Sequence, residues 1–136
     1  IDKLQPRAVI PVDLFGLPAE YDSIKKIGDE YNLFILEDAA QSFGGSINNI
    51  RTGSFGDVGA TSFFPAKPLG CYGDGGAVVT NDKSLYDSLI MLRNYGEGEN
   101  GQHHIVGFNS RLGEIQAAIL NVKLSRLDCW NNKRRY

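Results

Sequence analysis

The chain has 136 residues, of which 42% are hydrophobic and 22% charged, and its formal net charge is -2 at pH 7. It contains no block of like charges, which excludes the electrostatic footprint of a nucleic-acid or membrane-surface protein. No apolar stretch approaches the roughly 20 residues that a membrane-spanning helix needs. The two cysteines, Cys71 and Cys129, are far apart and fit no metal spacing, so we interpret them as reduced thiols of a cytoplasmic protein.

Strand and helix signals alternate along the chain, which predicts an α/β fold with a mostly parallel sheet. The predicted strands span residues 8–12, 33–36, 58–64 and 77–80. Residues 47–57 are predicted to form a loop or a short irregular pair, and residues 97–104 a mobile loop. The predicted helices begin at Pro18, at Asn81 or Asp82, and at Ser110. Their apolar stripes are Tyr21, Ile24, Ile27 and Tyr31; Leu85, Leu89 and Leu92; and Leu112, Ile115, Ile119 and Val122.

Lys67 is the first candidate for chemistry. It lies between an apolar run at residues 61–64 and a glycine-rich segment at residues 70–76. A lysine that is partly removed from water loses its proton more easily, and the neutral amine can attack a carbonyl to form a Schiff base. Considered alone, Lys67 fits an ordinary surface lysine on a turn better, and the segment at residues 37–42 is what favours the chemical interpretation.

Asp38 is the second candidate. It follows the predicted strand at residues 33–36, and ligands of open α/β sheets bind at the carboxyl ends of strands. A lysine and an aspartate at two neighbouring strand ends indicate a pyridoxal phosphate site, with the aspartate as partner of the pyridine nitrogen. The small and polar residues that follow Asp38 are also compatible with a helix N-cap at this position.

Seven sequence blocks carry a resemblance to a known family. They are residues 9–16, 37–42, 53–57, 62–67, 73–80, 92–96 and 107–111. In order and spacing these blocks resemble the sugar aminotransferases of the DegT/DnrJ/EryC1/StrS group. The resemblance implies the fold-type I architecture of aspartate aminotransferase, a three-layer α/β/α arrangement around a mostly parallel sheet.

The same resemblance implies roles for five residues. Lys67 would carry pyridoxal phosphate and move a proton during the reaction, and Asp38 would keep the pyridine nitrogen protonated. Gln41 would lie near the cofactor ring, and Ser62 would bind its phosphate. Asn109 would reach the phosphate in the neighbouring subunit, which implies a homodimer with its active site at the interface.

From the residues alone, three of these positions have other interpretations. Gln41 fits a polar residue on the first turn of a helix, Ser62 fits a buried serine bonded to a backbone carbonyl, and Asn109 fits a helix cap. His103 and His104 have no carboxylate or cysteine at ligand spacing, so we expect no metal site.

The resemblance also implies an activity. The expected reaction transfers an amino group, with glutamate as the expected donor, to a keto group of a nucleotide-linked sugar. Related proteins with histidine at the position of Lys67 are sugar dehydratases, so lysine favours the transaminase. A dehydratase of the same fold and a non-catalytic, regulatory homologue are the alternatives.

Members of this family are much longer than this chain. Residues 1–136 are therefore expected to be part of the cofactor-binding large domain. The upstream cofactor loop and the C-terminal small domain would lie outside them. We expect this segment to be inactive alone.

Overall fold

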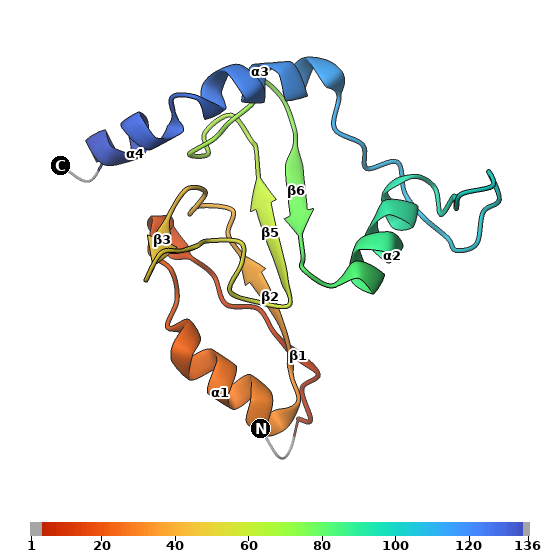
Figure 1. Ribbon diagram of the computed structural model, residues 1–136, viewed down its shortest axis with the longest axis horizontal. Helices are drawn as coiled ribbons and strands as arrows, with labels where there is room; N and C mark the ends of the chain where they lie inside the picture. Colours follow the sequence, from red (N-terminus) through yellow and green to blue (C-terminus); the bar gives the residue numbers. More distant parts are fainter. Residues whose placement is uncertain (1–3, 135–136) are drawn as a thin grey trace.

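The computed structural model describes residues 4–134 and contains a four-stranded sheet. In spatial order the strands are β1 (Ala8–Val9), β2 (Phe34–Asp38), β5 (Val58–Ser62) and β6 (Gly76–Val79). The first three run parallel and β6 is antiparallel to β5 (Figure 1). The predicted α/β fold with a mostly parallel sheet is therefore confirmed.

Register determines which residues share the carboxyl edge of the sheet. Asp38, the last residue of β2, is paired with Ala60 of β5. Ser62 ends β5 two residues later. Because β2 and β5 are parallel, their carboxyl ends lie at the same edge. Strand β1 is shorter than predicted, but the isolated bridge between Val12 and Asp38 continues its course to that edge.

A small hairpin follows β2. Strands β3 (Ser46–Ile47) and β4 (Ile50–Arg51) are antiparallel, so the short pair predicted in residues 47–57 is present. Asn48 and Asn49 connect the two strands with φ values of 50° and 65°. Two positive φ values in a two-residue hairpin loop match a type I′ turn, in which asparagine is one of the favoured residues.

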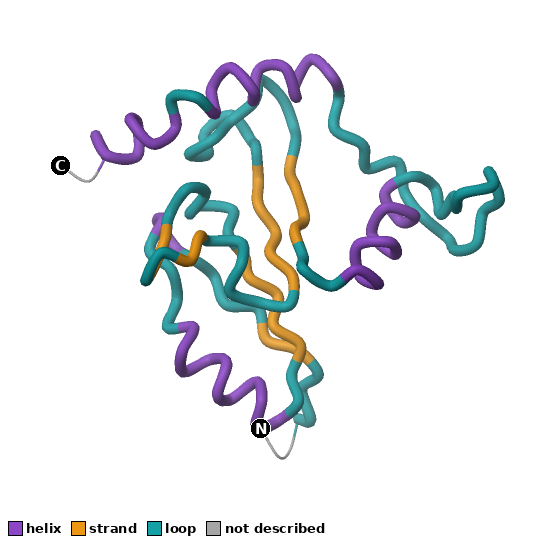
Figure 2. Tube along the Cα trace, viewed as in Figure 1, coloured by secondary structure: helices purple, strands orange, loops and turns teal. Residues whose placement is uncertain are grey.

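Helices lie around the sheet in the part of the chain that the structure describes (Figures 1 and 2). They are α1 (Tyr21–Tyr31), α2 (Lys83–Arg93), α3 (Glu114–Leu124) and α4 (Leu127–Arg134). Asp82 caps α2, since its Oδ1 accepts hydrogen bonds from the backbone N–H groups of Ser84 and Leu85. No helix within residues 4–134 is both long enough and apolar enough to cross a bilayer.

Three helix predictions were wrong in detail. Pro18 lies before α1 rather than in its first turn. The helix expected from Ser110 begins at Glu114, and α3 ends at Leu124 before α4 begins. The predicted apolar face of this helix also fails, because Ile115 and Val122 are exposed.

The buried core lies between the sheet and the helices α3 and α4. Its members are Phe63, Leu69, Cys71, Leu120 and Leu127. Phe43 and Phe63 contact edge to face, with ring centroids 5.8 Å apart. The core therefore joins the segment that follows β5 to the helical end of the chain.

Gly59, buried in the middle of β5, gives a prediction about stability. A Cβ atom added there would lie 2.2 Å from the carbonyl oxygen of Gly53. We expect Gly59→Ala to reduce the free energy of unfolding by about 1–3 kcal/mol, because backbone rather than a flexible side chain must move. Urea denaturation measures the change. Gly113→Ala is the control, since its Cβ meets no atom within 4 Å, and equal losses in both variants would contradict the prediction.

Candidate functional site

Asp38 lies at the carboxyl end of β2, as the sequence predicts. Its Oδ1 accepts a hydrogen bond from the backbone N–H of Ala40 at 3.0 Å. Residues 40–44 form turns rather than a helix, so the helix-cap interpretation is wrong. Within residues 4–134, no group bonds to Oδ2 of Asp38. One carboxylate oxygen therefore holds the local turn, and the other is free to accept a proton donor.

Gln41 lies in the same turn and contacts a second loop. Its Oε1 accepts a hydrogen bond from the backbone N–H of Phe15 at 2.7 Å. Phe15 lies in the 3-10 turn Leu14–Gly16 with φ at 58°, and the residue is 89% exposed. The interpretation of Gln41 as a residue on the first turn of a helix is wrong, because no helix follows β2 directly. Gln41 instead links the turn after β2 to residues 13–16.

Ser62 and Lys67 follow the neighbouring strand. The Oγ of Ser62 accepts from the backbone N–H of Phe64 at 3.2 Å, so its own proton is free to be donated. The expected alternative, a serine that donates to a backbone carbonyl, is absent from the described contacts of Ser62. Lys67 is half-buried, and its backbone N–H closes a turn to the carbonyl of Phe64 at 2.9 Å. In the described structure its amine makes no hydrogen bond or ion pair.

Hydrogen bonds from Cys71 and Lys123 anchor the loop that carries Lys67. Cys71 is fully buried, and its Sγ donates to the carbonyls of Phe63 and Gly73, each at 3.0 Å. Lys123 of α3 donates to the carbonyl of Gly70 at 2.6 Å. Cys71 is therefore a small buried residue that fills the space beside this loop. These contacts anchor the end of the loop, while the Lys67 amine has no bond of its own.

Asn109 lies apart from the other four predicted residues. It is exposed on the connection between α2 and α3, where it forms an isolated bridge with Asn94. Its Oδ1 accepts from Nε of Arg111 at 3.2 Å. Gly113 precedes α3 as its N-cap, so the helix-cap interpretation of Asn109 is wrong. The structure therefore places Asp38 and Ser62 at the ends of two neighbouring parallel strands, with Gln41 and Lys67 in the segments that follow them. Asn109 lies on the separate connection between α2 and α3.

Buried acidic residues beside the strand end were missed in the sequence. The carboxylate of Asp13 accepts from the hydroxyls of Tyr21 and Ser42, both at 2.8 Å, and from the backbone N–H of Ala19 at 3.1 Å. Asp13 follows an apolar run, as Asp38 does, and that pattern was the available signal. Glu37 accepts from the backbone N–H groups of Gly53 and Phe55, the latter at 2.7 Å.

The pKa of Glu37 is raised above its usual value. Burial is the largest cause, and the negative charge of Asp13 adds to it. The two backbone N–H donors lower the pKa but do not offset the burial. Glu37 therefore holds its proton to a higher pH than an exposed glutamate.

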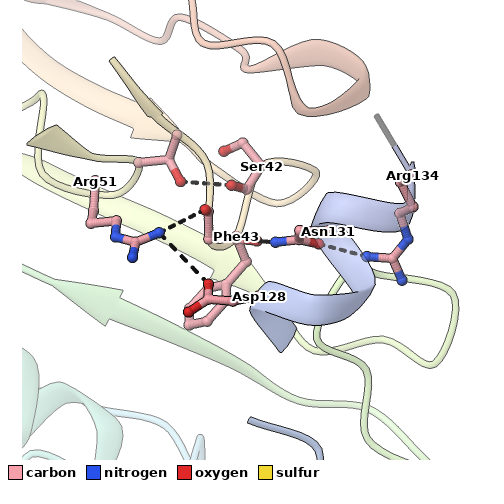
Figure 3. A network of polar contacts seen from close by, with 8 residues as sticks. Ser42, Phe43, Arg51, Asp128, Asn131 and Arg134 are labelled. Atoms are coloured by element: carbon pink, nitrogen blue, oxygen red, sulfur yellow. Dashed lines mark hydrogen bonds and ion pairs between the residues drawn. The ribbon is translucent and has the colours of Figure 1, made fainter. Parts of the chain in front are cut away.

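Helix α4 supports the turn after Asp38 from the outside (Figure 3). The side chain of Asn131 donates to the carbonyl of Phe43 at 3.2 Å, and Arg51 donates to the carbonyl of Gly44 at 2.9 Å. Thr52 donates to the carbonyl of Ser42 at 2.7 Å. The turn is thus held by side chains from two other segments of the chain, helix α4 and the end of β4.

A cavity lies beside β5, β6 and α2. It has a volume of about 790 Å³ and is lined mainly by apolar residues of β5, β6 and α2. Its lining includes none of Asp38, Gln41, Ser62 and Lys67. Within the described residues, no cluster of His, Cys, Asp or Glu has an arrangement that could hold a metal ion.

The free groups at the strand ends fit pyridoxal phosphate. They comprise a half-buried amine on Lys67, an unpaired carboxylate oxygen on Asp38 and a hydroxyl proton on Ser62. The amine can form a Schiff base with a carbonyl compound. The carboxylate oxygen can accept from a protonated ring nitrogen, and the hydroxyl can donate to a phosphate. The chemistry of these donors and acceptors therefore matches the aldehyde, the ring and the phosphate of this cofactor.

Several known proteins with similar sequences are named as sugar transaminases. The chain is 49% identical over 128 residues to dTDP-3-amino-3,4,6-trideoxy-alpha-D-glucose transaminase of Streptomyces venezuelae, covering 94% of this chain and 34% of that protein. It is 46% identical over 129 residues to UDP-N-acetyl-3-dehydro-alpha-D-glucosamine 3-aminotranferase of Acidithiobacillus ferrooxidans, covering 95% and 35%. The chain thus spans about a third of the length of these relatives.

Solved structures agree with the sequence relatives. A DegT DnrJ EryC1 StrS aminotransferase from Brucella abortus is 57% identical and superposes with a TM-score of 0.87 over 90% of this chain and 33% of its own. A protein from Bacillus subtilis with bound cofactor PMP is 30% identical, with a TM-score of 0.74 over 84% of this chain and 26% of its own. The model of the DegT/DnrJ/EryC1/StrS aminotransferase family matches residues 2–136, and the chain belongs to this family.

Proposed function

We propose that the whole protein is a pyridoxal-phosphate-dependent aminotransferase and that Lys67 and Asp38 are its catalytic residues. The observation that carries this proposal is that an unpaired carboxylate oxygen of Asp38 lies at the end of β2, while the half-buried, unbonded amine of Lys67 belongs to the loop after the adjacent parallel strand β5. Family membership supports it, since a solved relative is described with bound cofactor PMP, the amino form of pyridoxal phosphate.

Each residue has a distinct task. The bound cofactor supplies an electron sink for the carbon that loses a proton. Lys67 Nζ would hold the cofactor covalently and then, once freed, accept and return a proton as a general base and acid. The free Oδ2 of Asp38 would keep a proton on the ring nitrogen. Ser62 Oγ would donate to the phosphate, and Gln41 would lie against the ring.

The proposed substrates are a nucleotide-linked keto sugar and an amino donor, which we propose is glutamate. The support is that two relatives are named as transaminases of dTDP-linked and UDP-linked sugars. The direct experiment incubates the full-length protein with pyridoxal phosphate, a keto sugar nucleotide and glutamate labelled with ¹⁵N. Labelled amino sugar supports the proposal. A product that has lost oxygen without gaining nitrogen would support the dehydratase alternative instead.

We further propose a homodimer in which Asn109 reaches the phosphate bound by the partner subunit. The support is that Asn109 is exposed and lies apart from the other four residues. Mixing full-length Lys67→Ala with full-length Asn109→Ala is expected to restore activity that neither variant has alone, because mixed dimers regain one intact site. The measurement is turnover after joint refolding. If mass analysis verifies mixed dimers but turnover does not recover, the proposal of a shared site is overturned.

The domain is proposed to continue beyond these residues. Ile115, Val122 and Val106 are exposed apolar side chains, and the apolar cavity beside α2 has no occupant among the described residues. Residues 1–136 would accordingly be part of a cofactor-binding large domain and inactive alone. We also propose a cytoplasmic location, in keeping with two cysteines that are both free thiols.

A further inference from the structure

Two carboxyl groups lie together beneath the candidate site without a basic partner. The side chains of Asp13 and Glu37 are both fully buried. Val12 bridges in parallel to Asp38, so Asp13 and Glu37 each lie one residue from this bridge and on the same face of the two strands. The hydroxyl of Tyr21 donates to Asp13, and its ring stacks on Phe55, whose backbone N–H donates to Glu37. The recorded partners of the two carboxyl groups within residues 4–134 are backbone N–H groups and hydroxyls, not lysine, arginine or histidine. Two buried negative charges in this arrangement would repel strongly, so one proton between them is the favoured state.

We propose that Asp13 and Glu37 share a single proton and act as positioning residues for the strip that carries the candidate cofactor contacts, residues 38–41. The role of that strip rests on the proposed function. The shared proton does not, because it follows from the burial and bonding of the pair.

Asp13 and Glu37 make contacts at the two ends of residues 38–41. Glu37 directly precedes Asp38 in β2 and joins that strand end to Gly53 and Phe55 of the turn before β5. At the other end, Asp13 accepts from Ser42, the residue after Gln41.

Asp13 also begins the turn that carries Phe15. The backbone N–H of Phe15 bonds to Gln41, so this turn contacts the strip directly. Phe15 holds an unusual positive φ of 58°, which costs free energy and persists only when neighbouring contacts impose it. Loss of the Asp13 anchor would release the turn and leave Gln41 without its partner.

The groups around the pair add no positive charge. Tyr21 of α1 donates to Asp13, and burial, followed by the bond to Asp13, raises its pKa. Asp38 adjoins Glu37 on β2, and Asp57, in the turn before β5, accepts from the backbone N–H of Ile35. Each of these groups is neutral or negative over the working pH range. They therefore favour keeping the proton in the pair.

The sign of the pH dependence follows from linkage. The folded-state pKa of Glu37 lies above its ordinary 4.5, so folding retains a proton that the unfolded chain releases. The stabilisation is complete below the unfolded pKa and is lost as pH rises through the folded pKa. Within that window the unfolding equilibrium constant attributable to this proton rises about tenfold per pH unit.

Asp13→Asn is the sharpest variant. The asparagine Oδ1 can still accept from Ala19 and Tyr21, and its amide N–H group can donate toward Glu37 where the shared proton was. The pair keeps a charge of minus one but has no proton to lose. We measure urea unfolding of the full-length protein, without cofactor, from pH 5 to pH 9, for the wild type and for Asp13→Asn.

The expected result is that the wild type loses stability relative to Asp13→Asn as pH rises, by up to tenfold per pH unit in the unfolding constant. Parallel profiles for the two proteins would overturn the shared proton. If Asp13→Asn fails to fold, Glu37→Gln provides the same comparison. It should be less stable at every pH, since its amide nitrogen cannot accept from both Gly53 and Phe55, yet its profile should be flat in the same way.

A second readout tests positioning. The affinity for pyridoxal phosphate of the wild type should fall over the same pH window, and Asp13→Asn should flatten that fall. Ser42→Ala is the matched control, because it removes one bond to Asp13 but keeps the proton, and it should retain the pH dependence of the wild type. If the affinities of wild type and Asp13→Asn change alike with pH while their stabilities diverge, the positioning role is wrong. If no protein binds the cofactor at any pH, the proposed function fails and the stability comparison still decides the shared proton.

Discussion

Replacement of Lys67 by alanine is expected to reduce turnover of the full-length protein by at least about a thousandfold. The reason is that, in the proposed mechanism, Lys67 Nζ would be both the covalent attachment point and the group that moves the proton. Loss of a general acid and base alone typically costs about 10²–10⁴-fold. The cofactor should still bind noncovalently, because Ser62 and Asp38 remain. The measurement is single-turnover formation of the amino sugar, with cofactor binding followed by fluorescence.

Two further variants sharpen this test. Lys67→Arg keeps a positive charge but cannot supply a neutral amine, so it should be as inactive as Lys67→Ala. Lys25→Ala removes an exposed lysine of α1 and should leave turnover unchanged. Activity in Lys67→Arg close to wild type would mean that charge, rather than the amine, is what the site needs.

Replacement of Asp38 by asparagine is expected to lower turnover by about 10²–10³-fold while the protein stays folded. Asparagine Oδ1 can keep the bond to the backbone N–H of Ala40, so the turn after β2 is preserved. The charge that would hold a proton on the cofactor nitrogen is lost, however, and electrostatic stabilisation of this kind is worth about that much. Proton loss from the amino donor should therefore become rate-limiting.

A deuterium label on the α-carbon of glutamate checks this expectation. Turnover of Asp38→Asn should slow further with the deuterated donor, because breaking that bond limits the rate. Asp29→Asn, an exposed position on α1, is the matched control and should behave as the wild type. An Asp38→Asn variant with normal turnover would remove Asp38 from the catalytic residues.

The local parts of the site could be predicted from the sequence. Asp38 follows a short apolar run, and Lys67 lies between such a run and a glycine-rich segment. A pattern of this kind places a residue at a strand end without knowledge of the rest of the fold. The parallel pairing of β2 with β5 then brings the two ends to one edge.

Other features depend on tertiary contacts. The pattern of residues 77–80 indicates a strand but not its direction, and β6 is antiparallel. Leu112 has the spacing of a helical residue but packs against the core before α3 begins, so spacing alone misplaced the helix start. Apolar spacing records burial and does not require a helix.

The Asp13–Glu37 pair shows the same limit within the site. Each residue follows an apolar run in its own segment, but that pattern does not show that the two side chains are buried on the same face. Their relation arises because Val12 bridges to Asp38 and brings two distant segments together. The role of Asn109 could not be tested in the same way. The contact proposed for it is with a phosphate bound by a partner subunit, so the contacts within one chain do not include it.

The central claim is that the amine of Lys67 holds the cofactor, and reduction with borohydride tests it most directly. The full-length protein is incubated with pyridoxal phosphate, reduced, digested and analysed by mass. We expect one cofactor adduct, on the peptide that contains Lys67. Lys83, which pairs with Asp87, and Lys123, which bonds to Gly70, should stay unmodified. An unmodified Lys67, or adducts distributed over Lys25, Lys83 and Lys123, would contradict the claim.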